Sequence, residues 1–113
     1  MDDLFKLSDD IINAELAELQ SGWTYAGDTI AKTFTFDDFA DAADFVAAVG
    51  DLSNDMEGHA PDEVVVRGCT VHLRLATHSV QGVSEADLDM ARACDEIVEG
   101  ALAWAVAEKY EKG

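Results

Sequence analysis

Basic residues are scarce in this chain of 113 residues, where seven Lys and Arg stand against 24 Asp and Glu and the formal net charge is −17. Nucleic acids and anionic membrane surfaces are bound through clustered cations, so we expect neither as a partner. A strongly acidic surface favours solubility, including solubility in a salty cytoplasm, and it also attracts basic proteins. The charge is compatible with either role.

The sequence also has no long apolar run, no secretory signal and few cysteines. A membrane-spanning helix needs about 20 consecutive apolar residues, and no such run is present. The first stretch, MDDLFKLSDD, has neither the basic nor the apolar region of a secretory signal. The two cysteines, Cys69 and Cys94, are isolated, which is typical of thiols in a reducing compartment. These absences indicate a cytoplasmic protein.

Apolar residues, in contrast, are abundant and make up 49% of the chain. This share is enough to build a hydrophobic core without disulfide staples. A length of 113 residues fits one domain, and neither a linker nor an internal repeat interrupts the sequence. We therefore expect a single domain over residues 1–113.

Capping residues and apolar spacing predict three helices. Ser8 is a candidate N-cap of the first helix, because apolar residues follow it at helical spacing. Thr35 and Asp38 form a capping box that would begin the second helix. Ser84 and Asp87 form another, which would begin a long last helix.

The second predicted helix has an apolar face and an acidic face, and Gly58 and Pro61 are expected to follow its end. The apolar face is predicted to contain Phe39, Ala42, Val46 and Val49. The acidic stripe, which we expect to be solvated, contains Asp37, Asp41, Asp44, Asp51 and Asp55.

Two hairpins separate these helices in the sequence. Residues 23–36 read as two strands around a turn at Gly27-Asp28, and residues 63–78 read as two strands around Arg67-Gly68. The element order is therefore α-β-β-α-β-β-α. It predicts an α+β fold in which a four-stranded antiparallel sheet carries three helices on one face.

All three histidines, His59, His72 and His78, lie between residues 57 and 78. In the fourth predicted strand, side chains alternate between the core and the uncovered face of the sheet. The core side is predicted to hold Val71, Leu73 and Leu75, and the uncovered side His72, Arg74, Ala76 and His78.

Three interpretations of the clustered histidines are open. A metal site would need a third ligand that the spacing does not supply. Acid–base chemistry suits imidazoles, which titrate near neutrality and can both give and take a proton. The third interpretation is that they are ordinary polar residues on an exposed sheet face.

Three stretches of the sequence resemble the pterin-4a-carbinolamine dehydratase family over about residues 7 to 100. The first is LSDDIINAELAEL, followed by GW and KTFTFDDFADAADFVAAV. The second is Asp55-x-x-x-His59-x-Pro61, and the third is VHLRLATHSVQGVSEADLDMA. The family typically has acidic-x-x-x-His-His-Pro, then a strand, then Thr-His and Gly-Leu-[Ser/Thr]-x-x-Asp. The joint order and spacing of these motifs carry the resemblance.

The resemblance implies an antiparallel four-stranded sheet with three helices on one side, assembled into a homodimer or tetramer. It also implies a reaction in which water is eliminated from a 4a-hydroxytetrahydropterin to give a quinonoid dihydropterin. That chemistry needs an acid for the departing hydroxyl and a base for the proton on N5, and histidines suit both roles. The family needs no metal and no bound cofactor.

Carried over by position, the resemblance implies that His59, His78 and Asp87 are the catalytic residues. It further implies that Asp55, Pro61 and Thr77 contact the pterin substrate. Asp87 also has a second interpretation as a capping residue, and Asp55 as part of the acidic stripe. His72 matches a position of variable type and is not assigned to the site.

Three departures from the family pattern lie on the active-site side. The second histidine of the family's pair is replaced by Ala60, whose methyl group cannot exchange a proton. The family's aromatic residue ten positions before His78 is Gly68 here, which predicts a missing wall of the pterin pocket. One extra residue near Glu63 predicts a shifted loop or a bulge beside the site.

The departures favour a protein that keeps the dehydratase scaffold, has lost full activity and acts by binding another protein. The family includes a dehydratase-like protein linked to α-carboxysomes, which resembles an assembly factor for Rubisco. A similar role here would make the Rubisco large subunit a client and carboxysomes a location. The alternative is an active dehydratase that uses the remaining histidines. A third hypothesis is a dimerisation partner in transcription, as in some animal members.

Overall fold

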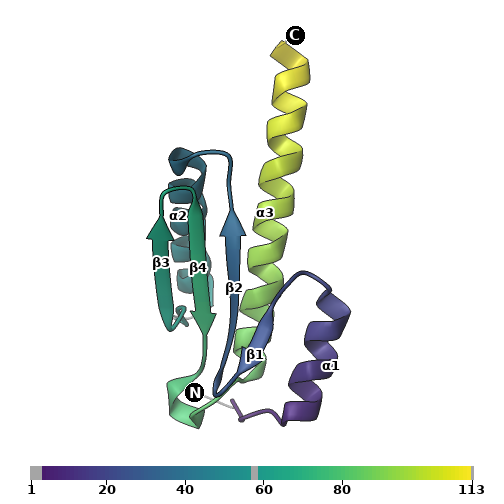
Figure 1. Ribbon diagram of the computed structural model, residues 1–113, viewed down its shortest axis with the longest axis vertical. Coiled ribbons are helices and arrows are strands. Elements are labelled where there is room, and N and C mark those ends of the chain that lie inside the picture. Colours follow the sequence, from purple (N-terminus) through teal and green to yellow (C-terminus); the bar gives the residue numbers. More distant parts are fainter. Residues whose placement is uncertain (1–3, 57–58, 113) are drawn as a thin grey trace.

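The computed structural model describes residues 4–56 and 59–112, with side chains for those up to residue 100. The elements are α1 (Asp9–Leu19), β1 (Thr24–Ala26), β2 (Thr29–Thr35), α2 (Phe39–Asp55), β3 (Glu63–Arg67), β4 (Thr70–Leu75), the short 3-10 helix η1 (His78–Val80) and α3 (Glu85–Lys112). The predicted order of helices and strands is confirmed (Figure 1). Gly58, which was expected to follow the end of the second helix, lies outside the described residues.

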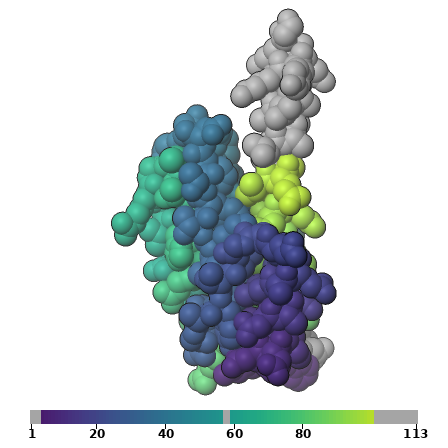
Figure 2. All heavy atoms as spheres, turned by 45° about the vertical axis from the view of Figure 1, so that its right-hand side comes forward, coloured from purple at the N-terminus to yellow at the C-terminus, as the bar shows by residue number. Residues whose placement is uncertain are grey.

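The four strands form one sheet in the order β1-β2-β4-β3, and each neighbouring pair is antiparallel. The helices lie on one side of this sheet, which leaves the other side uncovered (Figure 1). The predicted α+β fold class is therefore confirmed. Figure 2 shows α1 and β3 at opposite sides of the molecule. Within the described residues, none of the helices combines the length and the apolar character that a membrane crossing requires.

The turn between β3 and β4 falls at Gly68 and Cys69, one residue later than predicted. Arg67 still belongs to the ladder, because it pairs with Thr70 across the turn. Gly68 has φ +59°, a left-handed conformation that glycine adopts without steric cost. The two-residue turn therefore follows the position of the glycine rather than that of the arginine.

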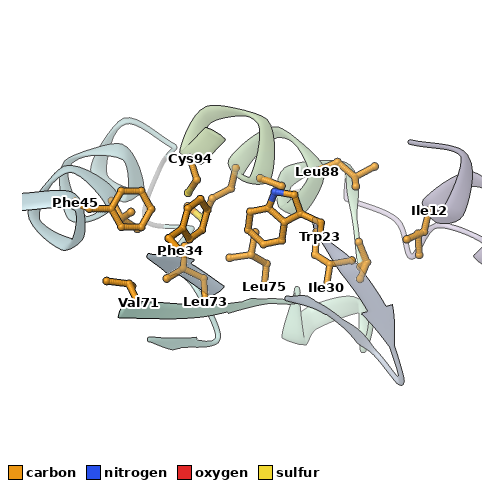
Figure 3. Packing of buried hydrophobic residues seen from close by; sticks show 14 of the residues in the cluster. Ile12, Trp23, Ile30, Phe34, Phe45, Val71, Leu73, Leu75, Leu88 and Cys94 are labelled. Carbon is orange, nitrogen blue, oxygen red and sulfur yellow. The ribbon is translucent and has the colours of Figure 1, made fainter. Parts of the chain in front are cut away.

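The core lies between the sheet and the helices, as the alternation in β4 predicted. Val71, Leu73 and Leu75 are each 0% exposed, and Figure 3 shows them pointing from the sheet toward the helix layer. Phe34 of β2 packs on Phe45 of α2, with ring centroids 4.7 Å apart. Burial of such side chains is the main driving force for folding.

The start of α2 differs from the prediction. Asp38 is the N-cap, and its carboxylate accepts a hydrogen bond of 2.9 Å from the backbone N–H of Asp41. Thr35 is the last residue of β2 instead, where it pairs with Thr70. The prediction of a capping box at Thr35 was wrong because the backbone N–H of the next residue, Phe36, is still bonded to Cys69 and the helix begins only at Phe39.

The buried face of α2 also differs from the prediction at one end. Ala42, Phe45 and Val49 are buried, whereas Phe39 is 62% exposed. Phe36, which precedes the helix, packs on Phe45 with ring centroids 5.2 Å apart and fills this end of the core. The acidic stripe is exposed throughout, as predicted.

A carboxylate on α3 ties the helix layer to the sheet, and the sequence did not predict it. Asp95 accepts hydrogen bonds from Trp23 Nε1 at 3.1 Å and from Lys32 Nζ at 2.8 Å. Arg92, one turn earlier, pairs with Glu15 of α1. These polar bonds fix α3 against both α1 and the sheet.

Candidate functional site

The site is built around a buried carboxylate at the start of α3. Asp87 is 0% exposed, and its Oδ1 accepts a hydrogen bond from the His59 ring at 2.8 Å from Nε2. His59 lies between α2 and β3 in the sequence, and its side chain is 15% exposed. The structure thus brings together two of the predicted site residues that are 28 positions apart.

The second oxygen of Asp87 is held by the chain around it. Oδ2 accepts a hydrogen bond of 2.8 Å from the Thr77 hydroxyl and one of 2.9 Å from the Ser84 backbone N–H. Because the Thr77 proton points at the carboxylate, the Ser84 hydroxyl donates to Thr77 Oγ1 at 2.7 Å. Asp87 therefore both caps α3 and holds His59, so the two interpretations drawn from the sequence are compatible.

A second carboxylate–imidazole pair lies beside the first. His78 Nε2 is 2.5 Å from Asp62 Oδ1, and Asp62 Oδ2 is 3.4 Å from Arg74 Nη2. Arg74 also lies 3.4 Å from Glu63. Sequence reasoning did not select Asp62. The available signal was an acidic residue directly after Pro61 at the start of a strand.

The sequence predicted that His78 lies on the same strand as His72, and the structure shows that it does not. β4 ends at Leu75, and His78 begins η1, where its side chain is 85% exposed. The bridge between Thr77 and Gly82 turns the chain back at this point. His72 remains on the uncovered sheet face, and its Nδ1 is 2.8 Å from Thr33 Oγ1.

The two pairs belong to one continuous group of residues. His59 bonds to Asp87, Asp87 bonds to Thr77, and Thr77 is followed in the chain by His78. His78 bonds to Asp62, which lies three residues after His59. This closed ring of bonds and chain segments, the two-histidine site, lies at the end of the sheet where β4 leads through η1 into α3 (Figure 1).

Other predicted residues are less closely involved. Asp55 is the last residue of α2 and is exposed, and no bond joins its carboxylate to the two-histidine site among the described side chains. Pro61 is half-buried and joins Ala60 to Asp62 within the ring. Ala60, where the family has its second histidine, is exposed. An imidazole at this position would also be exposed to solvent.

Of the predicted consequences of the departures, the one at Gly68 is corrected by the structure and the one near Glu63 is supported. Gly68 lies in the β3–β4 turn, at the end of the hairpin opposite to His78, so it does not remove a wall beside the histidines. Glu63 pairs with Arg74, and the register continues without interruption to Arg67 and Thr70. The backbone N–H of Asp62 also bonds to the Arg74 carbonyl at 2.7 Å, so two successive residues oppose Arg74, as in the predicted bulge beside the site.

Chemically, the two-histidine site offers two imidazoles, each bonded through Nε2 to a carboxylate. Such a pair can take one proton and give another within a single reaction, because imidazole works as acid and base near neutral pH. In the described part of the chain, no three His, Cys, Asp or Glu side chains are grouped as metal ligands would be.

Comparison with known proteins places this chain in a family. The family profile described as Pterin 4 alpha carbinolamine dehydratase matches residues 5–97. A protein of Halobacterium salinarum, provisionally named pterin-4-alpha-carbinolamine dehydratase, is 33% identical over 91 residues, covering 80% of this chain and 94% of the relative. A Mycobacteroides abscessus protein with the same provisional name is 40% identical over 89 residues, covering 79% of this chain and 92% of the relative.

The fold leads to the same family. A crystal structure from Brucella melitensis, described as a transcriptional coactivator/pterin dehydratase, superposes with a TM-score of 0.76 and 32% sequence identity. The superposition covers 81% of this chain and 97% of that one. The resemblance inferred from the sequence motifs is confirmed: the chain belongs to the pterin-4a-carbinolamine dehydratase family.

Proposed function

We propose that the protein is a working pterin-4a-carbinolamine dehydratase that uses His59 and His78 as its acid–base pair. One observation carries the proposal: the fully buried carboxylate of Asp87 is bonded to His59. Burying a carboxylate is costly, and a buried carboxylate that orients an imidazole is a recurrent feature of catalytic sites. Capping of α3 accounts for the bonds of Asp87 to Thr77 and Ser84, whereas the bond to His59 is the one that the proposed chemistry uses.

The proposed reaction eliminates water from a 4a-hydroxytetrahydropterin. A protonated imidazole gives its proton to the 4a-hydroxyl, and the carbon–oxygen bond breaks as water leaves. A neutral imidazole takes the proton from N5, whose bonding electrons form the new double bond between N5 and C4a. The product is the quinonoid dihydropterin, and no metal or bound cofactor takes part.

Ala60 limits the expected rate without removing the chemistry. A positioned acid or base typically contributes a factor of about a hundred to ten thousand. Two imidazoles still supply one proton donor and one acceptor, so the loss of a third weakens rather than abolishes the site. Restoring it with Ala60→His is expected to raise kcat, since the new ring would lie at the surface of the two-histidine site.

The test is dehydration of 4a-hydroxytetrahydropterin by the purified protein, measured above the uncatalysed rate. His59→Ala and His78→Ala are each expected to lower kcat at least about a hundredfold. His72→Ala is the matched control, because this third histidine is bonded to Thr33 on the uncovered sheet face. If the unmodified protein is no faster than the background reaction, the proposal fails.

A second candidate function is protein binding by a scaffold with reduced activity. Ala60 and the net charge of −17 favour it. The partner would be a protein with a basic surface, and an α-carboxysome role would make it the Rubisco large subunit. Co-purification of this chain with unassembled large subunit, together with a higher yield of soluble Rubisco, would support this function. No binding and no change in yield would exclude it.

A further inference from the structure

We propose that Asp62 is the positioning residue for His78, so that the site contains two carboxylate–imidazole pairs rather than one. This inference rests on the proposed function, in which His78 exchanges a proton with the pterin. The family motifs did not select Asp62. It is assigned from its contacts with His78 and Arg74.

Asp62 is held firmly enough to orient another side chain. Its backbone N–H donates a hydrogen bond of 2.7 Å to the carbonyl of Arg74, the residue that also pairs with Glu63. Its side chain is only 17% exposed, and its Oδ2 faces Arg74 Nη2 at 3.4 Å. Both the backbone and the carboxylate of Asp62 are therefore anchored to β4.

His78, in contrast, has little else to orient it. Its side chain is 85% exposed and begins a short 3-10 helix. The backbone there is fixed by the Thr77–Gly82 bridge, but a bridge of main-chain bonds does not select a side-chain rotamer. Among the described side chains, Asp62 is the one that bonds to the His78 ring. Without this bond, the imidazole would sample several rotamers in water.

The bond also decides which ring nitrogen does the chemistry. A carboxylate only accepts hydrogen bonds, so the His78 proton facing Asp62 lies on Nε2. Nδ1 is then the nitrogen that can receive a proton from substrate. His59 has the same polarity, because its Nε2 faces Asp87. Each imidazole thus keeps Nε2 toward a carboxylate and leaves Nδ1 for proton exchange with the substrate.

Glu63 provides a matched control for Asp62. Both carboxylates lie 3.4 Å from Arg74 on neighbouring residues, and only Asp62 reaches His78. Replacing either by its amide removes one negative charge from the same cluster. A purely structural role in the ion pairs with Arg74 would make the two replacements equivalent.

The test compares Asp62→Asn with Glu63→Gln in the full chain. Asp62→Asn is expected to lower kcat about tenfold or more with KM changed less than about twofold, because the substrate still binds but the ring is misplaced. Glu63→Gln is expected to keep both constants within about twofold. Equal effects of the two replacements on kcat would overturn the proposal, and thermal melts of both variants show that each is folded.

Nitrogen-15 NMR of the imidazoles tests the positioning even if the protein proves inactive. The unmodified protein is expected to show His78 as one tautomer with its proton on Nε2, and Asp62→Asn to show a mixture. An unmodified protein in which His78 already shows the mixture of a free imidazole overturns the proposal, whatever the variant does. Inactivity combined with a single His78 tautomer would reject the proposed function while supporting the role of Asp62 in orienting the ring.

Discussion

The carboxylate of Asp87 is bonded both to the start of α3 and to His59. It is 0% exposed and accepts hydrogen bonds from His59, from the Thr77 hydroxyl and from the Ser84 backbone. Removing the Asp87 carboxylate would leave its buried hydrogen-bond donors unpaired. Leaving buried polar groups unpaired costs more free energy than the net energy of the bonds themselves. The sequence suggested a capping role and a site role for Asp87 separately, and the structure shows the capping contact and the contact with His59 on the same carboxylate.

Asp87→Ala is therefore expected to destabilise the fold by about 3 kcal/mol or more. Asp87→Asn is expected to cost less, because an amide oxygen can still accept from Thr77 and from Ser84 N–H. Urea denaturation measures both values, provided that the unfolding free energy of each variant depends on urea concentration with the same slope. His59→Ala serves as the comparison, since it removes one partner at the edge of the site. Equal stability of Asp87→Ala and the unmodified protein would show that the network contributes nothing to folding.

Cys94 behaves as part of the core rather than as a reactive thiol. It is buried against the sheet, and burial, with a smaller contribution from the charge of Asp95, raises its pKa from 9.0 to about 12. Below pH 9 the thiol is protonated in both the folded and the unfolded chain. Between pH 9 and 12 only the unfolded chain releases this proton, so the free energy of unfolding falls as pH rises.

Cys94→Ala isolates this effect, because every other titrating group is unchanged. The free energy of unfolding of the unmodified protein is expected to fall more steeply between pH 9 and 11 than that of the variant. The difference in slope is at most about 1.4 kcal/mol per pH unit. Chemical denaturation at a series of pH values measures it. Parallel slopes would mean that the folded protein does not suppress ionisation of this thiol.

At the scale of the elements, the start of α2 shows how a strand can override a local helix signal. Thr35 and Asp38 match the pattern of a capping box, yet Thr35 is paired with Thr70 and Asp38 is the cap. Local pattern alone cannot decide between these outcomes, since Thr35 is paired with Thr70, a residue distant in the chain.

Asp38→Ala is expected to destabilise the protein by about 1 kcal/mol, because the Asp41 N–H would lose its partner. Thr35→Ala is the control and is expected to change stability by less than about 0.5 kcal/mol at its exposed position. Thermal and urea unfolding measure both. A larger loss at Thr35 than at Asp38 would contradict the observed cap.

At the scale of the whole molecule, the net charge of −17 acts on folding through repulsion. The acidic stripe of α2 is exposed throughout. The distance over which charges act shrinks from about 10 Å at 0.1 M salt to about 3 Å at 1 M. Stability is therefore expected to depend on salt more than it does for a protein of balanced charge.

The melting temperature is expected to rise by several degrees between about 0.1 and 1 M KCl, as repulsion between the carboxylates is screened. A variant with both Asp44→Asn and Asp51→Asn carries two fewer of the stripe's charges and leaves the first turn of α2 unchanged. It is expected to melt higher at low salt and to respond less to KCl. An unchanged or lower melting temperature in high salt would show that repulsion between the carboxylates does not limit the stability of the fold.

The sequence by itself determined the fold and much of the site. Alternation in β4 predicted the buried Val71, Leu73 and Leu75, and the order of the motifs predicted the family. These features are local, because periodicity and motif spacing follow from the pitch of helices and strands. His59, Thr77, His78 and Asp87 were predicted as site residues, and the structure places all four in one ring of contacts.

Only the tertiary structure decided the partners within that site. Asp62 meets His78 because β4 ends at Leu75 and η1 turns the chain back toward the start of β3. Asp95 meets Trp23 and Lys32 because α3 crosses the sheet beside β1 and β2. Such contacts join residues that are distant in the chain. They depend on where each strand stops and how the helices lie on the sheet, which no local pattern encodes.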